Sequence, residues 1–248
     1  MKHRPEVSVV VPVFNEELCL PELVRRVAAA MAGARLSWQL VAVLDGCTDA
    51  SLEVLRRARA ACPQITVVSL RRTVGQHAAL AAGMRYSRGK VIVTLDGDLQ
   101  NPPEEIPRLL HRLQWGCDAV GTVRQARQDR FDRRAASALF SRLARALRLR
   151  HRISDPGCML RAWRRSVVEQ FLASGQAPAY LPIQLNRFAA SYEELEVQHA
   201  PRHAGRSRYS AWSLARLLTR ALVSATFPRV LARREPEVAC VLDDEASR

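Results

Sequence analysis

Long apolar runs are missing from this chain. No stretch reaches the about 18 consecutive apolar residues that a membrane-spanning helix needs. The first four residues lead directly into a strand-like run and contain no apolar region of a signal peptide. From these two absences we expect a chain that stays in the cytoplasm.

Glycine and proline account for 11 and 13 of 248 residues, too few for a low-complexity chain. A hydrophobic content of 48% excludes a disordered one. The six cysteines include no Cys-x-x-Cys pair and the six histidines are isolated, which predicts reduced thiols and no zinc site. This length fits one large domain, or one domain with a small appendage.

Lysine is almost absent, with two residues, so nearly all of the formal charge of +14 comes from arginine. The charge is uneven: residues 1–118 carry 15 basic and 12 acidic residues, and residues 119–248 carry 23 and 12. Between residues 197 and 234 there are eight arginines and no acid. Such a field attracts phosphates of a nucleic acid, a membrane surface or a substrate. Codon bias accounts for arginine in place of lysine, but not for this placement.

Strands and helices alternate along the first half. Short β-branched runs predict strands at 7–13, 39–44, 65–70, 91–95 and 118–123. Helical spacing predicts helices from residue 15 onward and at 51–61, 76–86 and 104–113. This order indicates an α/β fold with a mostly parallel sheet, whose ligands bind beyond the carboxyl ends of the strands.

The second half is less regular. We expect a basic helix at 133–149, a loop leading into a strand at 155–161, a helix at 167–173 and a strand at 194–197. An apolar stripe at helical spacing predicts an amphipathic helix at 212–225, and residues from about 233 read as a polar tail.

Asp96-Gly97-Asp98 follows an apolar strand at the ligand-binding end of this predicted sheet. Residues i and i+2 of an extended segment project the same way, so both carboxylates can face one divalent cation, with Gln100 as a further oxygen ligand. Mg²⁺ or Mn²⁺ held in this way neutralises a diphosphate leaving group. A lone Asp-x-Asp is a weak signal, but its place after a buried strand favours a metal site.

Several motifs appear in one order along residues 5–230. They are VSVVVPVFNEE from Val7, GQHAALAAG from Gly75, TLDGDLQNPPEEIPRL from Thr94, GTVRQARQD from Gly121, GCMLRAWRR from Gly157 and GRSRYS from Gly205. Together they make the chain resemble the family 2 glycosyltransferases of the GT-A fold, and within them the polyprenyl-phosphate glycosyltransferases. The motifs from Gly121 and Gly157 favour the aminoarabinose and glucosyl branch over the dolichol-mannose branch.

The resemblance implies a role for individual residues. The nucleotide-sugar would contact Pro12, Phe14, Glu16, Asp45, Arg72, Gly75, Gln76, Asp96 and Gly97, with Asp45 on the base. Asp96, Asp98 and Gln100 would hold Mg²⁺ or Mn²⁺. The lipid phosphate would contact Arg124, Arg133, Ser137, Arg202 and Ser207. Catalysis would depend on Asp96, Asp98, Arg124, Arg133 and Arg202.

The resemblance also implies an activity. The protein would transfer a sugar from a nucleotide donor, by preference a UDP-sugar, to undecaprenyl or another polyprenyl phosphate. The transfer would be metal-assisted and would invert the configuration at the anomeric carbon. It divides the chain into a GT-A catalytic domain at 1–210, an amphipathic interfacial segment at 211–232 and a tail at 233–248. The protein would then work peripherally at the cytoplasmic face of the inner membrane, on the membrane surface itself or through a separate anchoring subunit. Association with a second copy is left open, and no nucleic acid is expected.

Three departures from the family pattern stand out. Leu44 replaces the first of two adjacent aspartates, Pro156 stands where relatives often carry an aromatic residue, and the two transmembrane helices that follow in relatives are missing here. Three alternatives stay open. One is a family 2 enzyme with another lipid or a soluble acceptor, and another is a GDP-mannose enzyme. The third is a non-catalytic basic module for membrane or nucleic acid, which an aromatic content of 6% disfavours.

Overall fold

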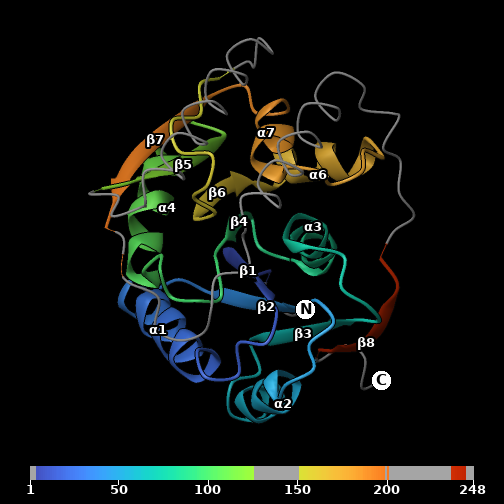
Figure 1. Ribbon diagram of the computed structural model, residues 1–248. Helices are drawn as coiled ribbons and strands as arrows, with labels where there is room; N and C mark the ends of the chain where they lie inside the picture. Colours follow the sequence, from blue (N-terminus) through green and yellow to red (C-terminus); the bar gives the residue numbers. More distant parts are fainter. Residues whose placement is uncertain (1–3, 126–150, 199, 201–235, 244–248) are drawn as a thin grey trace.

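The computed structural model describes residues 4–125, 151–198, 200 and 236–243 (Figure 1). The helices expected at 133–149 and 212–225 lie outside these residues. No helix in the described part of the chain combines the length and the apolar character needed to cross a membrane.

Among the described residues, eight strands form one mixed sheet in the order β7-β5-β6-β4-β1-β2-β3-β8. The strands are β1 (Val7–Val13), β2 (Trp38–Leu44), β3 (Ile65–Leu70), β4 (Val91–Thr94), β5 (Ala119–Arg124), β6 (Arg161–Arg164), β7 (Tyr192–Val197) and β8 (Val238–Leu242). β1 to β4 pair in parallel, as do β5 and β7, whereas β6 and β8 run antiparallel to their neighbours. The predicted α/β fold with a mostly parallel sheet is confirmed.

Helices cover both faces of this sheet. They are α1 (Leu20–Gly33), α2 (Ser51–Ala61), α3 (Gln76–Tyr86), α4 (Ile106–Gln114), which follows a 3₁₀ turn η1 (Pro103–Glu105), α6 (Arg165–Ala173) and α7 (Leu181–Asn186). α1, α2 and α4 pack on one face, and α3, α6 and α7 pack on the other (Figure 1).

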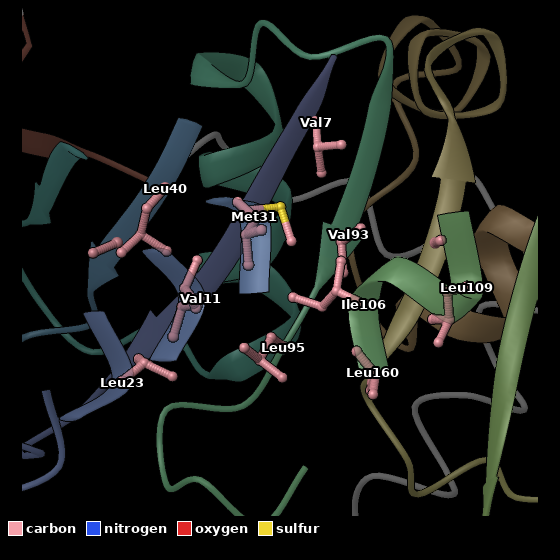
Figure 2. Close-up of a cluster of buried hydrophobic side chains, with 14 of the residues drawn as sticks. Val7, Val11, Leu23, Met31, Leu40, Val93, Leu95, Ile106, Leu109 and Leu160 are labelled. Atoms are coloured by element: carbon pink, nitrogen blue, oxygen red, sulfur yellow. The ribbon is translucent and has the colours of Figure 1, made fainter. Parts of the chain in front are cut away.

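Successive side chains of β1 point to opposite faces of the sheet, and both faces are apolar. Val9 and Val11 contribute to the core under α1 and α4, while Val10 between them contributes to the core under α3. Figure 2 shows the first of these cores, where Leu23 of α1 and Ile106 of α4 lie among strand residues. A strand buried on both faces reads as a continuous apolar run, which is why its position was predictable.

Two expectations about elements are corrected. The first helix begins at Leu20 rather than at Asn15. Asn15 has a φ of 53°, which is not helical, and its side chain is hydrogen-bonded to Thr48 in the loop after β2. The segment read as a polar tail contains β8, which pairs with the outer edge of β3. Its Val-Ala-Cys-Val-Leu run satisfies backbone groups that β3 would otherwise expose. The short helix α7 was not predicted.

The carboxyl ends of β1, β2, β3 and β4 lie at one edge of the sheet, since these strands are parallel. β5 is antiparallel to β6, which is antiparallel to β4, so the end of β5 reaches the same edge. The loop before β6 ends at this edge as well, because Arg161, the first residue of β6, pairs with Thr94 at the end of β4. We call this edge, with the loops that follow these strands, the carboxyl edge.

Candidate functional site

The loop after β1 is fixed to the loop after β2. The Asn15 side chain donates to Thr48 Oγ1 at 3.1 Å, and its own Oδ1 accepts from the Thr48 backbone N–H at 2.8 Å. The Ser51 hydroxyl accepts from the Glu16 backbone N–H at 3.1 Å. A Cβ atom built on Gly97 would lie 3.4 Å from the Pro12 carbonyl oxygen and 3.8 Å from Glu16 Cγ. The structure therefore brings Pro12, Glu16 and Gly97 together at the carboxyl edge, as expected for residues that contact one ligand.

Asp45 is only 3% exposed and holds the loop that follows β3. Its two carboxylate oxygens accept from the backbone N–H groups of Val74, at 2.6 Å, and Gly75, at 3.0 Å. Gly75 has a φ of +96°, which favours glycine. The structure thus gives Asp45 a structural role that the sequence did not predict, with two of its four lone-pair positions used. Leu44 beside it is 2% exposed and belongs to the apolar core.

The remaining residues expected at the nucleotide lie around this loop. Arg72 is exposed, Phe14 is half-buried, and Gln76 is the first residue of α3. Gln76 Nε2 donates to Asp96 Oδ1 at 2.6 Å. The ends of β2, β3 and β4 are therefore joined through residues 74–76 and the two aspartates Asp45 and Asp96.

Asp96 and Asp98 are oriented differently. Asp96 accepts from Gln76 at one oxygen and from Asn101 Nδ2, at 3.2 Å, at the other. Asp98 is 7% exposed, and its Oδ1 accepts from the Gln100 backbone N–H at 3.1 Å. Leu99, which follows Asp98 in the turn, has a φ of 62°, which is unusual for a bulky residue and is held by burial of its side chain. This strained turn places the Gln100 backbone N–H against the Asp98 carboxylate.

The side chains of Asp96, Asp98 and Gln100 offer hard oxygen donors of the kind that Mg²⁺ or Mn²⁺ prefers. No group of three or more His, Cys, Asp or Glu side chains able to hold a metal occurs in the part of the chain that the structure describes. Two carboxylates are nevertheless enough for a magnesium-type ion, which in proteins usually takes the rest of its ligands from water and substrate phosphates. The residues present therefore fit a metal that arrives with a diphosphate.

Arg124, expected on the lipid phosphate, is paired with Asp155. Its Nε and Nη2 donate to the two carboxylate oxygens at 2.7 and 3.0 Å, and the two side chains are 13% and 2% exposed. The Asp155 carbonyl also accepts from Nη2 of the fully buried Arg161 at 2.6 Å. Arg124, the last residue of β5, does lie at the carboxyl edge, and its pair with Asp155 joins β5 to the loop before β6. Sequence reasoning missed Asp155, because a single aspartate beside Pro156 reads as a turn.

Next to Gln76 lies a second set of residues that the sequence analysis did not predict. The His77 ring lies 4.7 Å from the ring of Tyr180, whose hydroxyl donates to the Pro156 carbonyl. Burial lowers the pKa of His77 from 6.5 to about 4, and its Nδ1 has no hydrogen-bond partner among the residues that the structure describes. This contact joins α3, α7 and the loop before β6, and it needed the tertiary fold to be seen. The last four expected site residues, Arg133, Ser137, Arg202 and Ser207, lie outside the described residues.

Curated proteins resemble this chain in sequence. Undecaprenyl-phosphate 4-deoxy-4-formamido-L-arabinose transferase from Pseudomonas paraeruginosa is 47% identical to the chain over 214 residues, which is 86% of this chain and 62% of that protein. The enzyme of the same name from Salmonella paratyphi A is 43% identical, with 86% and 65% covered. The chain thus spans less than two thirds of the length of these relatives.

Solved structures show the same fold at lower sequence identity. Glucosyl-3-phosphoglycerate synthase from Mycobacterium tuberculosis with Mn²⁺ and UDP-glucose superposes with a TM-score of 0.61 at 16% identity, covering 89% of this chain and 79% of that one. A mannosyltransferase from Pyrobaculum calidifontis with GDP-mannose and Mn²⁺ gives 0.62 at 20% identity, covering 95% and 67%. The family model described as glycosyl transferase family 2 matches residues 8–172. With this match over most of the described sheet, the chain belongs to glycosyl transferase family 2.

Proposed function

We propose that the protein transfers a sugar from a nucleotide-sugar, by preference a UDP-sugar, to the phosphate of undecaprenyl or another polyprenyl phosphate. Relatives that are 43–47% identical carry a name that states an undecaprenyl-phosphate acceptor. Structural neighbours bind UDP-glucose or GDP-mannose together with Mn²⁺. Both parts of the reaction are thus represented among proteins that this chain resembles.

The pair Asp96 and Asp98 is the observation that carries the proposal. Both carboxylates lie at the carboxyl edge, and both are oriented by hydrogen bonds within the protein. A preorganised pair of carboxylates would hold a divalent cation against the diphosphate without having to reorient, and the cation would stabilise the charge that develops on the departing group. We propose that both residues, with Gln100, hold Mg²⁺ or Mn²⁺, which would neutralise the diphosphate when bound.

The chemistry requires little of the protein beyond positioning. A phosphate oxygen of the lipid is already anionic at pH 7, so no general base has to remove a proton. This oxygen forms a bond to the anomeric carbon while the bond from that carbon to the diphosphate breaks, which inverts the configuration at that carbon. The protein must hold two anions close together, which we assign to the arginines of the second half, Arg133 and Arg202 among them.

The site of action follows from the acceptor. A polyprenyl phosphate resides in a membrane, so the carboxyl edge must approach a membrane surface. We propose that the protein works peripherally at the cytoplasmic face of the inner membrane, directly or with an anchoring subunit. The acid-free arginine segment between residues 197 and 234 supports contact with an anionic surface.

An acceptor comparison tests this function. The purified full chain is incubated with radiolabelled UDP-sugars or GDP-mannose and one of three acceptors: undecaprenyl phosphate, undecaprenol, or soluble phosphoglycerate. We expect label to enter the lipid fraction only with undecaprenyl phosphate and with a UDP-sugar. Transfer to the alcohol or to phosphoglycerate would instead favour a different acceptor, and transfer from GDP-mannose would favour the dolichol-mannose branch.

A further inference from the structure

A series of polar contacts leads from Asp96 into the centre of the sheet. Asn101 Nδ2 donates to Asp96 at 3.2 Å, and Asn101 Oδ1 lies 3.3 Å from Cys158 Sγ. Cys158 Sγ lies 2.9 Å from Thr122 Oγ1, which in turn donates to the Leu160 carbonyl at 2.7 Å. The series crosses from the turn after β4 to β5 and the loop before β6.

Donor and acceptor chemistry gives this series one direction. A carboxylate only accepts, so Asn101 must turn its NH₂ group toward Asp96 and its carbonyl toward Cys158. The carbonyl then needs a donor, which the Cys158 thiol supplies, since Thr122 gives its own proton to the Leu160 carbonyl. Burial raises the pKa of the Cys158 thiol, so the proton stays on the sulfur. Asn101 and Cys158 therefore each have one consistent role, and Thr122 adds an oxygen–sulfur contact to Cys158 in which no proton is shared.

Burial makes the arrangement rigid. Asn101 is 2% exposed, and Cys158 and Thr122 are fully buried. A buried amide that turned around would face the carboxylate with its own oxygen and leave the thiol without an acceptor, and both changes are unfavourable. Gln76 holds the other oxygen of Asp96 from the opposite side, at 2.6 Å. The carboxylate is thus fixed at both oxygens.

We propose that Asn101 is a positioning residue, held by Cys158, that sets the Asp96 carboxylate in the direction needed for a metal–diphosphate group. This inference rests on the proposed function for the identity of that ligand. It has a consequence that a merely structural role lacks: a change at Cys158, which does not contact Asp96, alters nucleotide binding through Asn101.

The first experiment needs no ligand. In ¹⁵N-labelled full chain, the side-chain NH₂ protons of Asn101 exchange slowly with solvent because they are bonded and buried. In Cys158→Ala we expect exchange faster by on the order of tenfold, the equivalent of one lost hydrogen bond, whereas Cys158→Ser keeps a donor and stays near wild type. Cys117→Ala, at a second buried cysteine whose sulfur faces the Arg112 carbonyl, is the matched control. Unchanged exchange in Cys158→Ala overturns the proposal.

The second experiment is a double-mutant cycle on the Kd for UDP measured with Mn²⁺ by calorimetry. We expect Asn101→Ala to weaken binding by about tenfold and Cys158→Ala by about threefold, in line with one weakened hydrogen bond to a charged group. The double variant should bind no more weakly than Asn101→Ala, because Cys158 then has no path to Asp96. Thermal unfolding is measured in parallel, so that a general loss of stability is told apart from a loss of UDP affinity.

The outcomes separate this inference from the proposed function. Additive losses in UDP affinity, or a Cys158→Ala variant that binds like Cys117→Ala, overturn the positioning role while leaving the function standing. A wild-type chain that binds no UDP with Mn²⁺ overturns the function and the assignment of the ligand. The exchange of the Asn101 amide then decides independently whether the hydrogen-bond series exists.

Discussion

At the scale of single residues, each carboxylate of the carboxyl edge depends on a different kind of donor. Asp45 is held by two backbone N–H groups, Asp96 by two side-chain amides, and Asp98 by the backbone of its own turn. Hydrogen bonds to an ionised group are stronger than those between neutral groups. These carboxylates therefore stabilise their own loops, in addition to any ligand that they bind. Substitutions at this edge should therefore change stability and binding in different proportions.

Asp45→Asn tests the loop role of Asp45. An asparagine has one acceptor oxygen, and its NH₂ group would face the N–H of Val74 or Gly75, so we expect a loss of about 1–3 kcal/mol in the free energy of unfolding. The loop would loosen and UDP affinity would fall with it. Urea unfolding and UDP calorimetry measure the two effects. Glu53→Gln, in an exposed helix pair with Arg57, is the control and should cost less than about 1 kcal/mol. An Asp45→Asn variant with wild-type stability would contradict the loop role.

His77 predicts a pH dependence of stability. Its pKa is lowered to about 4 in the folded protein, against 6.5 when unfolded, so the unfolded chain binds a proton first as the pH falls. The free energy of unfolding is then fully retained above pH 6.5 and decreases between 6.5 and 4, by up to about 3 kcal/mol. His77→Phe keeps a ring against Tyr180 but cannot titrate. Parallel stability curves for wild type and His77→Phe between pH 7 and 4 would rule out this contribution.

At the scale of elements, the pair of Arg124 and Asp155 joins the end of β5 to the loop before β6. Removing one partner of a buried pair leaves a charge without compensation, so Arg124→Leu should cost about 3–5 kcal/mol. The double variant Arg124→Leu with Asp155→Leu should recover part of this loss. Arg26→Leu, in the more exposed pair with Glu104, should cost about 1 kcal/mol or less. If Arg124→Leu instead raises only the KM for the lipid acceptor at unchanged stability, the sequence-based expectation of a phosphate contact is right.

The elements differ in how far the sequence could predict them. β1, α2, β3 and α3 follow from apolar runs and helical spacing, because these patterns depend on local burial. β8 was missed because its run is short and its partner β3 lies far away in the sequence. The pair Asp96 and Asp98 was visible in a motif, whereas Asn101, Cys158 and Thr122 come together only through the antiparallel return of β6. Contacts that depend on such long-range pairing leave no periodic signal.

At the scale of the whole molecule, β8 closes one edge of the sheet with residues from the end of the chain. Truncation after Pro236 removes it, exposes the outer edge of β3 and withdraws Val241 and Leu242 from the cores they pack against. We expect a loss of about 2–4 kcal/mol and a greater tendency to aggregate. Truncation after Asp243 keeps β8 and should leave the unfolding curve unchanged. Equal stability of the two truncated chains would show that β8 contributes little.

The charge is distributed unevenly between the two halves of the chain. Residues 1–118, which contain the expected nucleotide and metal residues, are close to neutral, whereas residues 119–248 carry most of the excess of arginine. We propose that the basic half serves the lipid phosphate and an anionic membrane surface. Transfer to lipid in vesicles should then slow as salt is raised, since exposed charges are screened, and UDP affinity should change less. Equal salt dependence of the two would contradict this division.

We propose that the carboxyl edge uses Asp98 and a divalent cation to transfer a sugar to a lipid phosphate. The most direct measurement is the initial rate of radiolabel transfer from a UDP-sugar to undecaprenyl phosphate with Mg²⁺ or Mn²⁺, with EDTA, and with Asp98→Ala. We predict transfer that EDTA abolishes, that added Mn²⁺ restores, and that falls by at least about 100-fold in Asp98→Ala. Transfer at the wild-type rate in EDTA or in Asp98→Ala would contradict the account.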